Sequence, residues 1–354
     1  MDEIKTVIYG TGAMGSNIVR LLQTKPQVKI AGAIDHDPKK IGRDLGSVSG
    51  LGSDLGVDVR FPPETILDNV KADLVIHTTT AFLEEAFDQI TAVLQRGMNV
   101  LTICQELFFP IGGNISKAGQ LDRLAKEKRV RMTAVGVNPG FVMDLVPVLC
   151  SLPCWQVDKV FVRRIVDFAP YGPDEMRHIG ANLTKEQFFQ GVREGAIGHI
   201  GLLETTAMVA HCLGFPVDEL QQTKEPLITD VPRESPFIRI EPGRVCGFKQ
   251  NAAALMKGKK VLDFRMVGIV ASDKNTDGVE TGDYTRITGI PNVDITIKEE
   301  IAQKGGLGTS GVAVNMIPRL LSSGPGFRTM DAYLPVHIWS AVDSPQPISK
   351  ISYY

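Results

Sequence analysis

Residues 4–15 read Ile-Lys-Thr-Val-Ile-Tyr-Gly-Thr-Gly-Ala-Met-Gly, and this stretch decides the fold of the first half of the chain. The six residues before Gly10 are mostly apolar and predict a short buried strand. After Gly15, the apolar residues Ile18, Leu21 and Leu22 have helical spacing. A glycine triplet between a strand and a helix is the fingerprint of a dinucleotide-binding βαβ unit, so we expect a Rossmann domain here.

Each glycine of this motif has its own physical task. Gly10 allows the tight turn, Gly12 lets the backbone approach a pyrophosphate, and Gly15 allows close packing of helix on strand. The pyrophosphate would then sit at the helix N-terminus, where N–H groups point toward it. The residues expected to contact it are Gly10, Thr11, Gly12, Ala13, Met14 and Gly15.

An acid follows the second expected strand at the position of a ribose ligand. This strand covers residues 28–34, and Asp35 comes about twenty residues after Gly15. A carboxylate there bonds a ribose 2′-hydroxyl and repels a 2′-phosphate, which predicts NAD as the preferred cofactor. NADP remains possible, because the same loop carries basic residues that can pair with a 2′-phosphate: His36, Lys39, Lys40 and Arg43.

The first half continues with alternating strands and helices. Strands are expected at 73–77, 99–104 and 131–137, and amphipathic helices at 82–94 and 117–128. The loops that follow parallel strands meet at the carboxyl edge of the sheet, where such domains bind their cofactor. The polar residues expected there are Thr78, Thr79, Thr80 and Asn138. Their alternative role is to cap helices.

A lone carboxylate, Glu106, comes just after the strand at 99–104. Its neighbours Leu107, Phe108 and Phe109 are apolar, and desolvation makes a carboxylate a better proton acceptor. This placement predicts a catalytic acid/base at the nicotinamide end of the cofactor. The alternative is an acid that only forms a salt bridge in a loop. Cys104 is interpreted as an inward-facing structural thiol.

The second half of the chain changes its pattern. Period-two segments at 159–168, 237–240, 261–270 and 293–298 predict a mostly antiparallel sheet with one solvated face. Helices lie between them, one starting with a capping box at Thr184. The fold class is therefore an α/β Rossmann domain plus an α+β domain. We expect the first at 1–142, completed by a helix at 309–321 that Pro318 interrupts within a returning segment near 309–330, and a substrate-binding and oligomerisation domain at 143–308.

Several residues are candidates for a substrate pocket. They are Phe141, Tyr171, Arg177, His178 and His199. Residues 170–180 are expected to form a loop over the site, and His199 to stand at a helix start. Arg163 and Arg164 are adjacent on a strand, so at most one of them can face a substrate carboxylate. For each candidate, a purely structural role is the alternative.

Composition excludes several other classes of protein. The chain has 354 residues and a net charge of −2, so nucleic acid is not an expected partner. The first strand begins near the N-terminus and no apolar run is long enough to span a bilayer, so neither a signal peptide nor a membrane span is expected. The five cysteines are scattered and suit reduced thiols in the cytoplasm, with no metal site.

The whole chain resembles the dihydrodipicolinate-reductase-like dehydrogenases, and among them the 2,4-diaminopentanoate dehydrogenases and native amine dehydrogenases. The stretches that carry the resemblance are GTGAMG at 10–15, HTTT at 77–80, TICQELFFP at 102–110, VNPGF at 137–141, GHIGLLET at 198–205 and AVNMIPRLL at 313–321. The chain lacks the paired histidines of the reductases themselves. It has Gln105-Glu106-Leu107 where sugar-oxidising relatives have Glu-Lys-Pro.

The resemblance implies a reaction and its components. These are oxidative deamination of an amine with NAD(P), or reductive amination of a carbonyl with ammonia, with Glu106 as catalytic acid/base. We also expect a homodimer, since two-fold dimers are the commonest soluble oligomers. Two alternatives stay open: an imine or enamine reductase that uses no free ammonia, and a non-catalytic NAD(H)-sensing protein.

Overall fold

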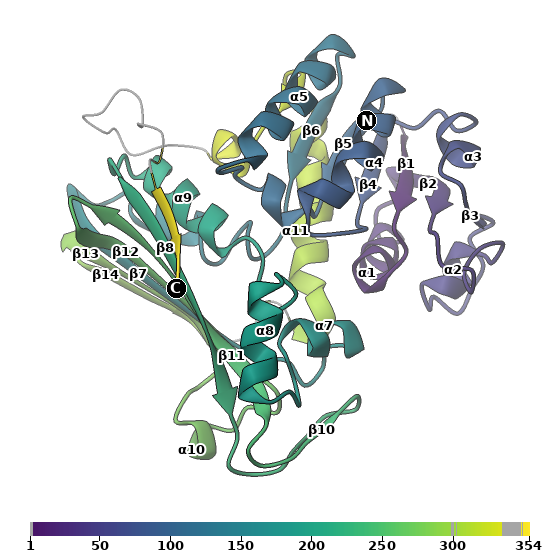
Figure 1. The fold of residues 1–354 in the computed structure, drawn as a ribbon. Coiled ribbons are helices and arrows are strands. Elements are labelled where there is room, and N and C mark those ends of the chain that lie inside the picture. The colour runs from purple at the N-terminus through teal and green to yellow at the C-terminus, as the bar shows by residue number, and fades with distance from the viewer. Residues whose placement is uncertain (1–2, 299–300, 302, 335–347, 349) are drawn as a thin grey trace. The chain divides into compact units, whose positions relative to one another are not determined.

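The computed structural model describes residues 3–298, 301, 303–334, 348 and 350–354. The chain divides into two compact units (Figure 1). The first unit consists of Met1–Gly140 and Gly306–Tyr333, and the second of Phe141–Gly305 and Leu334–Tyr354.

The first unit is built on a seven-stranded sheet in which all neighbouring strands are parallel. In sheet order its strands are β15 (Gly326–Phe327), β6 (Arg131–Ala134), β5 (Asn99–Thr102), β4 (Leu74–His77), β1 (Ile4–Tyr9), β2 (Val28–Ile34) and β3 (Val59–Arg60). Its helices are α1 (Ala13–Leu22), α2 (Leu45–Val48), α3 (Glu64–Leu67), α4 (Leu83–Gln95), α5 (Asn114–Glu127), α11 (Gln303–Leu321) and two 3₁₀ turns, η1 (Gln105–Leu107) and η2 (Met330–Tyr333). This confirms the predicted Rossmann architecture.

The order in which successive strands are added to the sheet reverses between β1 and β4, which are neighbours in it. From β1 the chain moves outward to β2 and β3, and from β4 it moves the other way to β5 and β6. Right-handed crossovers then place α1 and α4 on opposite faces of the sheet. Between such oppositely directed halves a crevice opens at the carboxyl ends of the strands, and this is where ligands bind in such folds.

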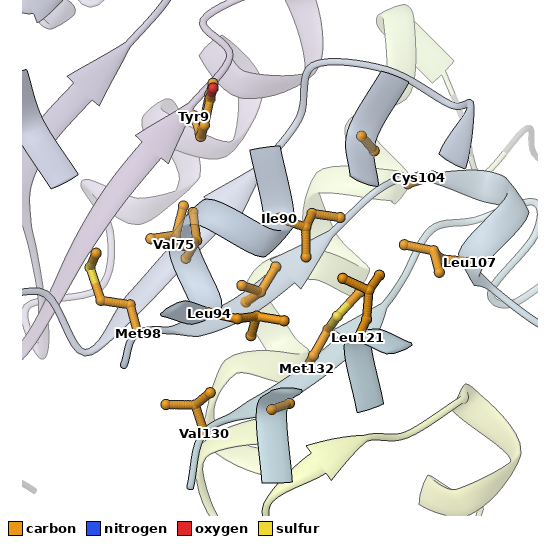
Figure 2. Packing of buried hydrophobic residues seen from close by; sticks show 14 of the residues in the cluster. Tyr9, Val75, Ile90, Leu94, Met98, Cys104, Leu107, Leu121, Val130 and Met132 are labelled. Carbon is orange, nitrogen blue, oxygen red and sulfur yellow. The ribbon is translucent and has the colours of Figure 1, made fainter. Parts of the chain in front are cut away.

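One face of this sheet packs on α3, α4 and α5 to form the main core. Figure 2 shows part of the cluster, including Ile90 and Leu94 of α4, Leu121 of α5 and Val75 of β4. Leu107 of η1 belongs to the same cluster and is fully buried. The segment that carries Glu106 is therefore anchored in the core on one side.

The last helix of the first unit differs from its predicted form. It begins at Gln303 rather than at 309 and continues through Pro318 without a break. Proline removes one backbone donor and so a single hydrogen bond to the preceding turn, and the helix continues to Leu321. Near its start, a Cβ on Gly306 would lie 2.2 Å from Met14 Cε, so α11 begins beside the glycine fingerprint.

The second unit is built on a seven-stranded mixed sheet. Its strands, in sheet order, are β14 (Val293–Ile297), β13 (Gly282–Ile290), β7 (Gln156–Asp167), β12 (Lys259–Ile269), β11 (Val245–Met256), β8 (Glu219–Ile228) and β16 (Lys350–Tyr353). Only the β7–β12 and β8–β16 pairs are parallel, so the predicted mostly antiparallel sheet is confirmed. The remaining elements are α6 (Leu145–Cys150), α7 (Pro173–His178), α8 (Lys185–Arg193), α9 (Leu202–Cys212), α10 (Lys274–Asp277) and a small ribbon of β9 (Arg233–Glu234) and β10 (Arg239–Ile240).

Two local predictions for the second unit have different outcomes. The capping box is confirmed, because Thr184 and Gln187 cap α8 reciprocally. The predicted loop at 170–180 is wrong in its middle, where α7 forms with Pro173 at its first position. Proline in the first turn loses no helical hydrogen bond, so it starts this helix instead of preventing it. Among the described residues, no helix is long and apolar enough to cross a membrane.

Cross-strand register separates the side chains of the second sheet into two faces. Asp283, Arg164, Met266, Gln250 and Lys224 are direct neighbours across five strands, so they share one face. Gln250 bonds the backbone of His199, which places the segment that leads into α9 on this face. The next residue on each strand, Arg163 among them, points to the opposite face.

Candidate functional site

The glycine fingerprint forms an open cradle at Gly12, between crowded positions at Gly10 and Gly15. Gly10 has a φ of +100°, and a Cβ on Gly15 would lie 2.0 Å from Gly10 O. By contrast, apart from the adjoining residues, no atom of the described part of the chain lies within 4 Å of a Cβ built on Gly12. The first helical bond of α1 runs from Ser16 N–H to Gly12 O, so the N–H groups before Ser16 precede the helical ladder. Open space beside helix-start N–H groups fits the pyrophosphate of a dinucleotide.

Asp35 stands at the end of β2 and is tied to the same turn. Its Oδ2 accepts the Thr11 N–H at 2.8 Å, the Thr11 hydroxyl at 2.6 Å and Lys40 Nζ at 3.0 Å. Its Oδ1 accepts the Asp37 N–H at 3.0 Å. Burial acts to raise the pKa of Asp35, but the hydrogen bonds from Thr11, Asp37 and Lys40 outweigh it and lower the pKa to about 2. The carboxylate is therefore ionised and fixed in orientation.

The three threonines after β4 have different surroundings. Thr78 is buried, and its hydroxyl donates to Gly10 O at 2.7 Å, which braces the fingerprint turn. Thr80 accepts the Phe82 N–H and donates to Glu85 Oε2 at 2.6 Å, so it stabilises the start of α4. The Thr79 hydroxyl donates to Gln89 Oε1 at 2.8 Å. All three hydroxyls thus have a protein partner.

Asn138 lies in a tight turn after β6. A Cβ on Gly140, whose φ is +133°, would lie 2.1 Å from Gly136 O. The turn therefore folds back on itself so closely that residue 140 must be glycine. It places Asn138 at the same carboxyl edge of the sheet as the fingerprint, Thr78 and Glu106, because each of these follows a parallel strand.

Glu106 lies in η1 and is held by the start of α4. Its carboxylate Oε2 accepts the Leu83 N–H at 2.7 Å, and its own N–H donates to Ala81 O at 3.3 Å. The side chain is neither fully buried nor fully exposed. No described residue donates a hydrogen bond to Glu106 Oε1, so one carboxylate oxygen is available to a ligand.

A buried histidine beside this segment was not predicted as a site residue. His77 ends β4 and is fully buried; its Nδ1 lies 2.9 Å from Thr102 Oγ1 and its Nε2 lies 2.9 Å from Gln89 Oε1. Burial lowers the pKa of His77 to about 4, although the bond to Gln89 acts to raise it. The ring is neutral near pH 7. Its position in the HTTT stretch was the only sequence signal, and an apolar strand with one histidine does not by itself indicate a network.

Of the candidate residues of the second unit, those at the end of α7 and His199 meet at one segment, 197–199. Gly198 N–H donates to His178 O at 2.9 Å, which joins this segment to the end of α7, where the Arg177 and His178 side chains are exposed. The Tyr171 ring packs against Phe168 at 5.0 Å between centroids. His199 lies three residues before α9 rather than at its start. The described contacts do not join Phe141 to this group.

Two residues that sequence reasoning missed fix the 197–199 segment on the sheet. The Gln250 side chain accepts the His199 N–H and donates to His199 O, both at 2.8 Å. Lys224 Nζ donates to Ile197 O at 3.0 Å, and its burial lowers its pKa. Both residues lie on strands that the periodicity did not reveal. Among the residues that the structure describes, no group of three or more His, Cys, Asp or Glu side chains is arranged to hold a metal.

Two protein families match separate parts of the chain. Residues 4–102 match the dihydrodipicolinate reductase N-terminal domain, and residues 141–346 match the 2,4-diaminopentanoate dehydrogenase C-terminal domain. The chain is 33% identical over 333 residues to the 2,4-diaminopentanoate dehydrogenase of Acetoanaerobium sticklandii. That alignment covers 93% of each protein.

Solved structures show the same fold. The amine dehydrogenase of Mycobacterium smegmatis superposes with a TM-score of 0.84 at 26% identity, over 96% of this chain and 98% of that one. GenD2 from gentamicin A biosynthesis, solved in complex with NAD, superposes with a TM-score of 0.58 at 15% identity, over 94% and 90%. The second likeness shows the fold alone.

Proposed function

The chain belongs to the 2,4-diaminopentanoate dehydrogenase family, and from that premise we propose that it is an NAD(P)-dependent amine dehydrogenase. It oxidises a CH–NH₂ donor to an imine that water hydrolyses, and in reverse it aminates a carbonyl with ammonia. The observation that carries the proposal is the placement of Glu106. One of its carboxylate oxygens is held by the start of α4, at the sheet edge that also carries the glycine fingerprint.

The cofactor is held by the first unit. The backbone of the turn from Gly10 to Gly15 holds the pyrophosphate, and Asp35 Oδ1 accepts from the adenosine ribose. Because Asp35 is ionised, we propose that NAD is preferred over NADP. Asn138 and the threonine loop contribute at the nicotinamide side. When bound, the nicotinamide supplies the redox chemistry by accepting hydride from the amine-bearing carbon.

Glu106 supplies the proton chemistry. Oε2 is committed to the Leu83 N–H, so Oε1 is the oxygen that first accepts a proton from the substrate ammonium. This proton then passes to solvent, which restores the carboxylate. The restored charge stabilises the cationic imine, an effect that grows when water is excluded, and the carboxylate then takes a proton from the water that attacks the imine carbon.

The second unit supplies the substrate pocket and the subunit contact. We propose that Tyr171, His178 and His199 line the pocket; the bond from Gly198 N–H to His178 O brings the segments of the two histidines together. Of the two adjacent arginines, Arg164 shares a sheet face with Gln250, but it is buried and pairs with Asp283 at 2.8 Å, so it is not available to a substrate carboxylate. We further propose a homodimer and a cytoplasmic location, the latter because each of the five cysteines keeps its thiol.

The family matches favour this activity over an imine reductase or an NAD(H) sensor. The decisive assay follows NADH formation with a panel of amines and diamino acids, and NADH consumption with ketones in the presence and absence of ammonia. Amine oxidation, together with ammonia-dependent reduction, is the expected result. Reduction that proceeds equally well without ammonia would instead identify an imine or carbonyl reductase, and cofactor binding without turnover would identify a sensor.

A further inference from the structure

Glu106 acts as the cap of α4 although it is distant in sequence. Leu83 is the first residue of that helix, so its N–H has no partner within the helix. The N-cap residue is Phe82, whose side chain has no acceptor, and Glu106 Oε2 takes that place at 2.7 Å. Any shift of α4 relative to the segment from Thr102 to Glu106 would therefore move or release the carboxylate.

A chain of hydrogen bonds joins the same two segments behind the cap. Gln89 belongs to α4, His77 ends β4, and Thr102 ends β5. The Cys104 N–H donates to Thr102 Oγ1 at 3.0 Å, and the same oxygen lies 2.9 Å from His77 Nδ1. Nε2 lies 2.9 Å from both Gln89 Oε1 and Thr79 Oγ1. Because the amide oxygen can only accept, the proton of the neutral imidazole is assigned to Nε2, and Nδ1 then accepts from the Thr102 hydroxyl. Helix α4 is thereby connected to the backbone two residues before Glu106.

We propose that Gln89, His77 and Thr102 are positioning residues that hold Glu106 in its capped orientation and present Oε1 to the substrate. The inference rests on the proposed catalytic role of Glu106. The three side chains act through their hydrogen bonds and contact neither substrate nor cofactor.

Burial of this network has a cost that apolar side chains would avoid. His77 and Thr102 are fully buried, and burial holds the imidazole neutral at a pKa of about 4. Apolar packing already anchors the same region, as Cys104 and Leu107 in Figure 2 illustrate. Hydrogen bonds add direction, which apolar contacts lack. In a catalytic site, misplacement of a reacting group by 1 Å can lower the rate about 100-fold. Directional hydrogen bonds that prevent such a shift can therefore offset the free energy needed to bury these polar side chains.

The test uses isosteric variants of Thr102. Thr102→Val keeps the shape and removes the hydroxyl, whereas Thr102→Ser keeps the hydroxyl and should rescue turnover. The matched control is Thr6→Val, because Thr6 is also fully buried on a strand of this sheet and its hydroxyl has no partner among the described residues. We expect Thr102→Val to lower kcat for amine oxidation by about tenfold or more, with NADH affinity unchanged. Thr102→Ser and Thr6→Val should stay within about twofold of the parent.

A double-variant experiment separates positioning from general stability. If Thr102 acts through Glu106, Thr102→Val should cause no further loss of kcat in a Glu106→Gln background. Equal fold-losses in both backgrounds, or full turnover in Thr102→Val, would overturn the inference. Full turnover in Glu106→Gln alone would instead overturn the proposed catalytic role of Glu106 on which the inference rests. If Thr102→Val does not fold, Gln89→Met on the partly exposed face of α4 replaces it, with the same expected loss and the same contrary outcomes.

Discussion

Lys40 Nζ bonds Asp35 Oδ2 at 3.0 Å, so the lysine that follows β2 pairs with the ribose-binding acid proposed above. Sequence alone left two roles for the basic residues of this loop, solvation or binding of a 2′-phosphate. With Lys40 on Oδ2, the Oδ1 atom, which accepts the Asp37 N–H, keeps a second lone pair for a ribose hydroxyl. A 2′-phosphate would have to break this ion pair and approach an ionised carboxylate, whose pKa is about 2.

Asp35→Asn should therefore change cofactor selectivity. The variant removes the repulsive charge and leaves Lys40 to pair with a 2′-phosphate, while the amide keeps the size of the side chain. A charge-assisted hydrogen bond is worth about 1.5–3 kcal/mol, so the ratio of kcat/KM for NADP to that for NAD should rise by roughly 10- to 100-fold. Asp37→Asn, two residues on in the same loop, is the control. An unchanged ratio in Asp35→Asn would show that Asp35 does not bind the adenosine ribose.

Of the fingerprint glycines, we expect Gly12 to matter for cofactor binding and Gly15 for the stability of the fold. Gly12→Ala adds a methyl group to open space, so the melting temperature should change little while NADH affinity falls. Gly15→Ala places the methyl group 2.0 Å from Gly10 O, so the melting temperature itself should fall. Differential scanning calorimetry and NADH titration on both variants test this. Equal stability losses in the two variants would show that the cradle at Gly12 is not open.

Sequence reasoning succeeded where the signal is local. The first two strands match their predicted bounds, Ile4–Tyr9 and Val28–Ile34, because short apolar runs beside glycine turns are typical of buried parallel strands. Glu106 was identified as a candidate because it directly follows such a strand. Its bond to Leu83 was not foreseen, since that contact joins residues 23 apart in sequence and depends on where α4 begins.

The second unit was harder to predict for two reasons. Strand β8 (Glu219–Ile228) reads as mostly polar and β11 (Val245–Met256) carries three consecutive alanines, so neither shows clean alternation. Part of the pairing in this sheet is also non-local, as in the parallel pairing of β7 with β12. The residues that fix the His199 segment, Lys224 and Gln250, lie on these strands and were missed with them.

Stability should fall in mild acid because of His77. Its pKa is lowered from 6.5 to about 4 in the folded protein, so between these values the unfolded chain binds more protons than the folded one. The stabilisation is fully present above pH 6.5 and is lost as the pH falls toward 4. At about 1.4 kcal/mol for each pH unit, the loss approaches roughly 3 kcal/mol.

Urea unfolding between pH 4.5 and 7.5 measures this dependence. His77→Asn, which retains an acceptor near Thr102, should show a shallower fall in unfolding free energy with decreasing pH than the parent. His36→Gln is the matched control, since His36 is exposed and should leave the slope as it is. Parallel slopes for the parent and His77→Asn would mean that His77 is protonated equally in both states.

Gln250→Leu should weaken substrate binding without affecting the cofactor. The variant removes both 2.8 Å bonds to the His199 backbone while keeping a similar volume in a fully buried position. At about 0.5–1.5 kcal/mol for each bond, the KM for amine should rise about tenfold. NADH affinity should stay constant, because Gln250 and the fingerprint belong to different units. Asn251→Leu, on the opposite sheet face, is the control. An unchanged KM for amine in Gln250→Leu would show that His199 does not line the substrate pocket.

Glu106→Gln tests the proposed chemistry most directly. The glutamine amide oxygen can still accept the Leu83 N–H, so the cap on α4 and the melting temperature should be retained. The proton acceptor is lost, and general acid–base catalysis is typically worth about 10²–10⁴-fold, so kcat should fall by that order. Glu84→Gln removes a charge from an exposed residue in the same first helical turn and should leave kcat near the parent value. If Glu106→Gln unfolds at lower temperature but keeps its turnover, the carboxylate is a helix cap alone, and the proton acceptor must lie elsewhere.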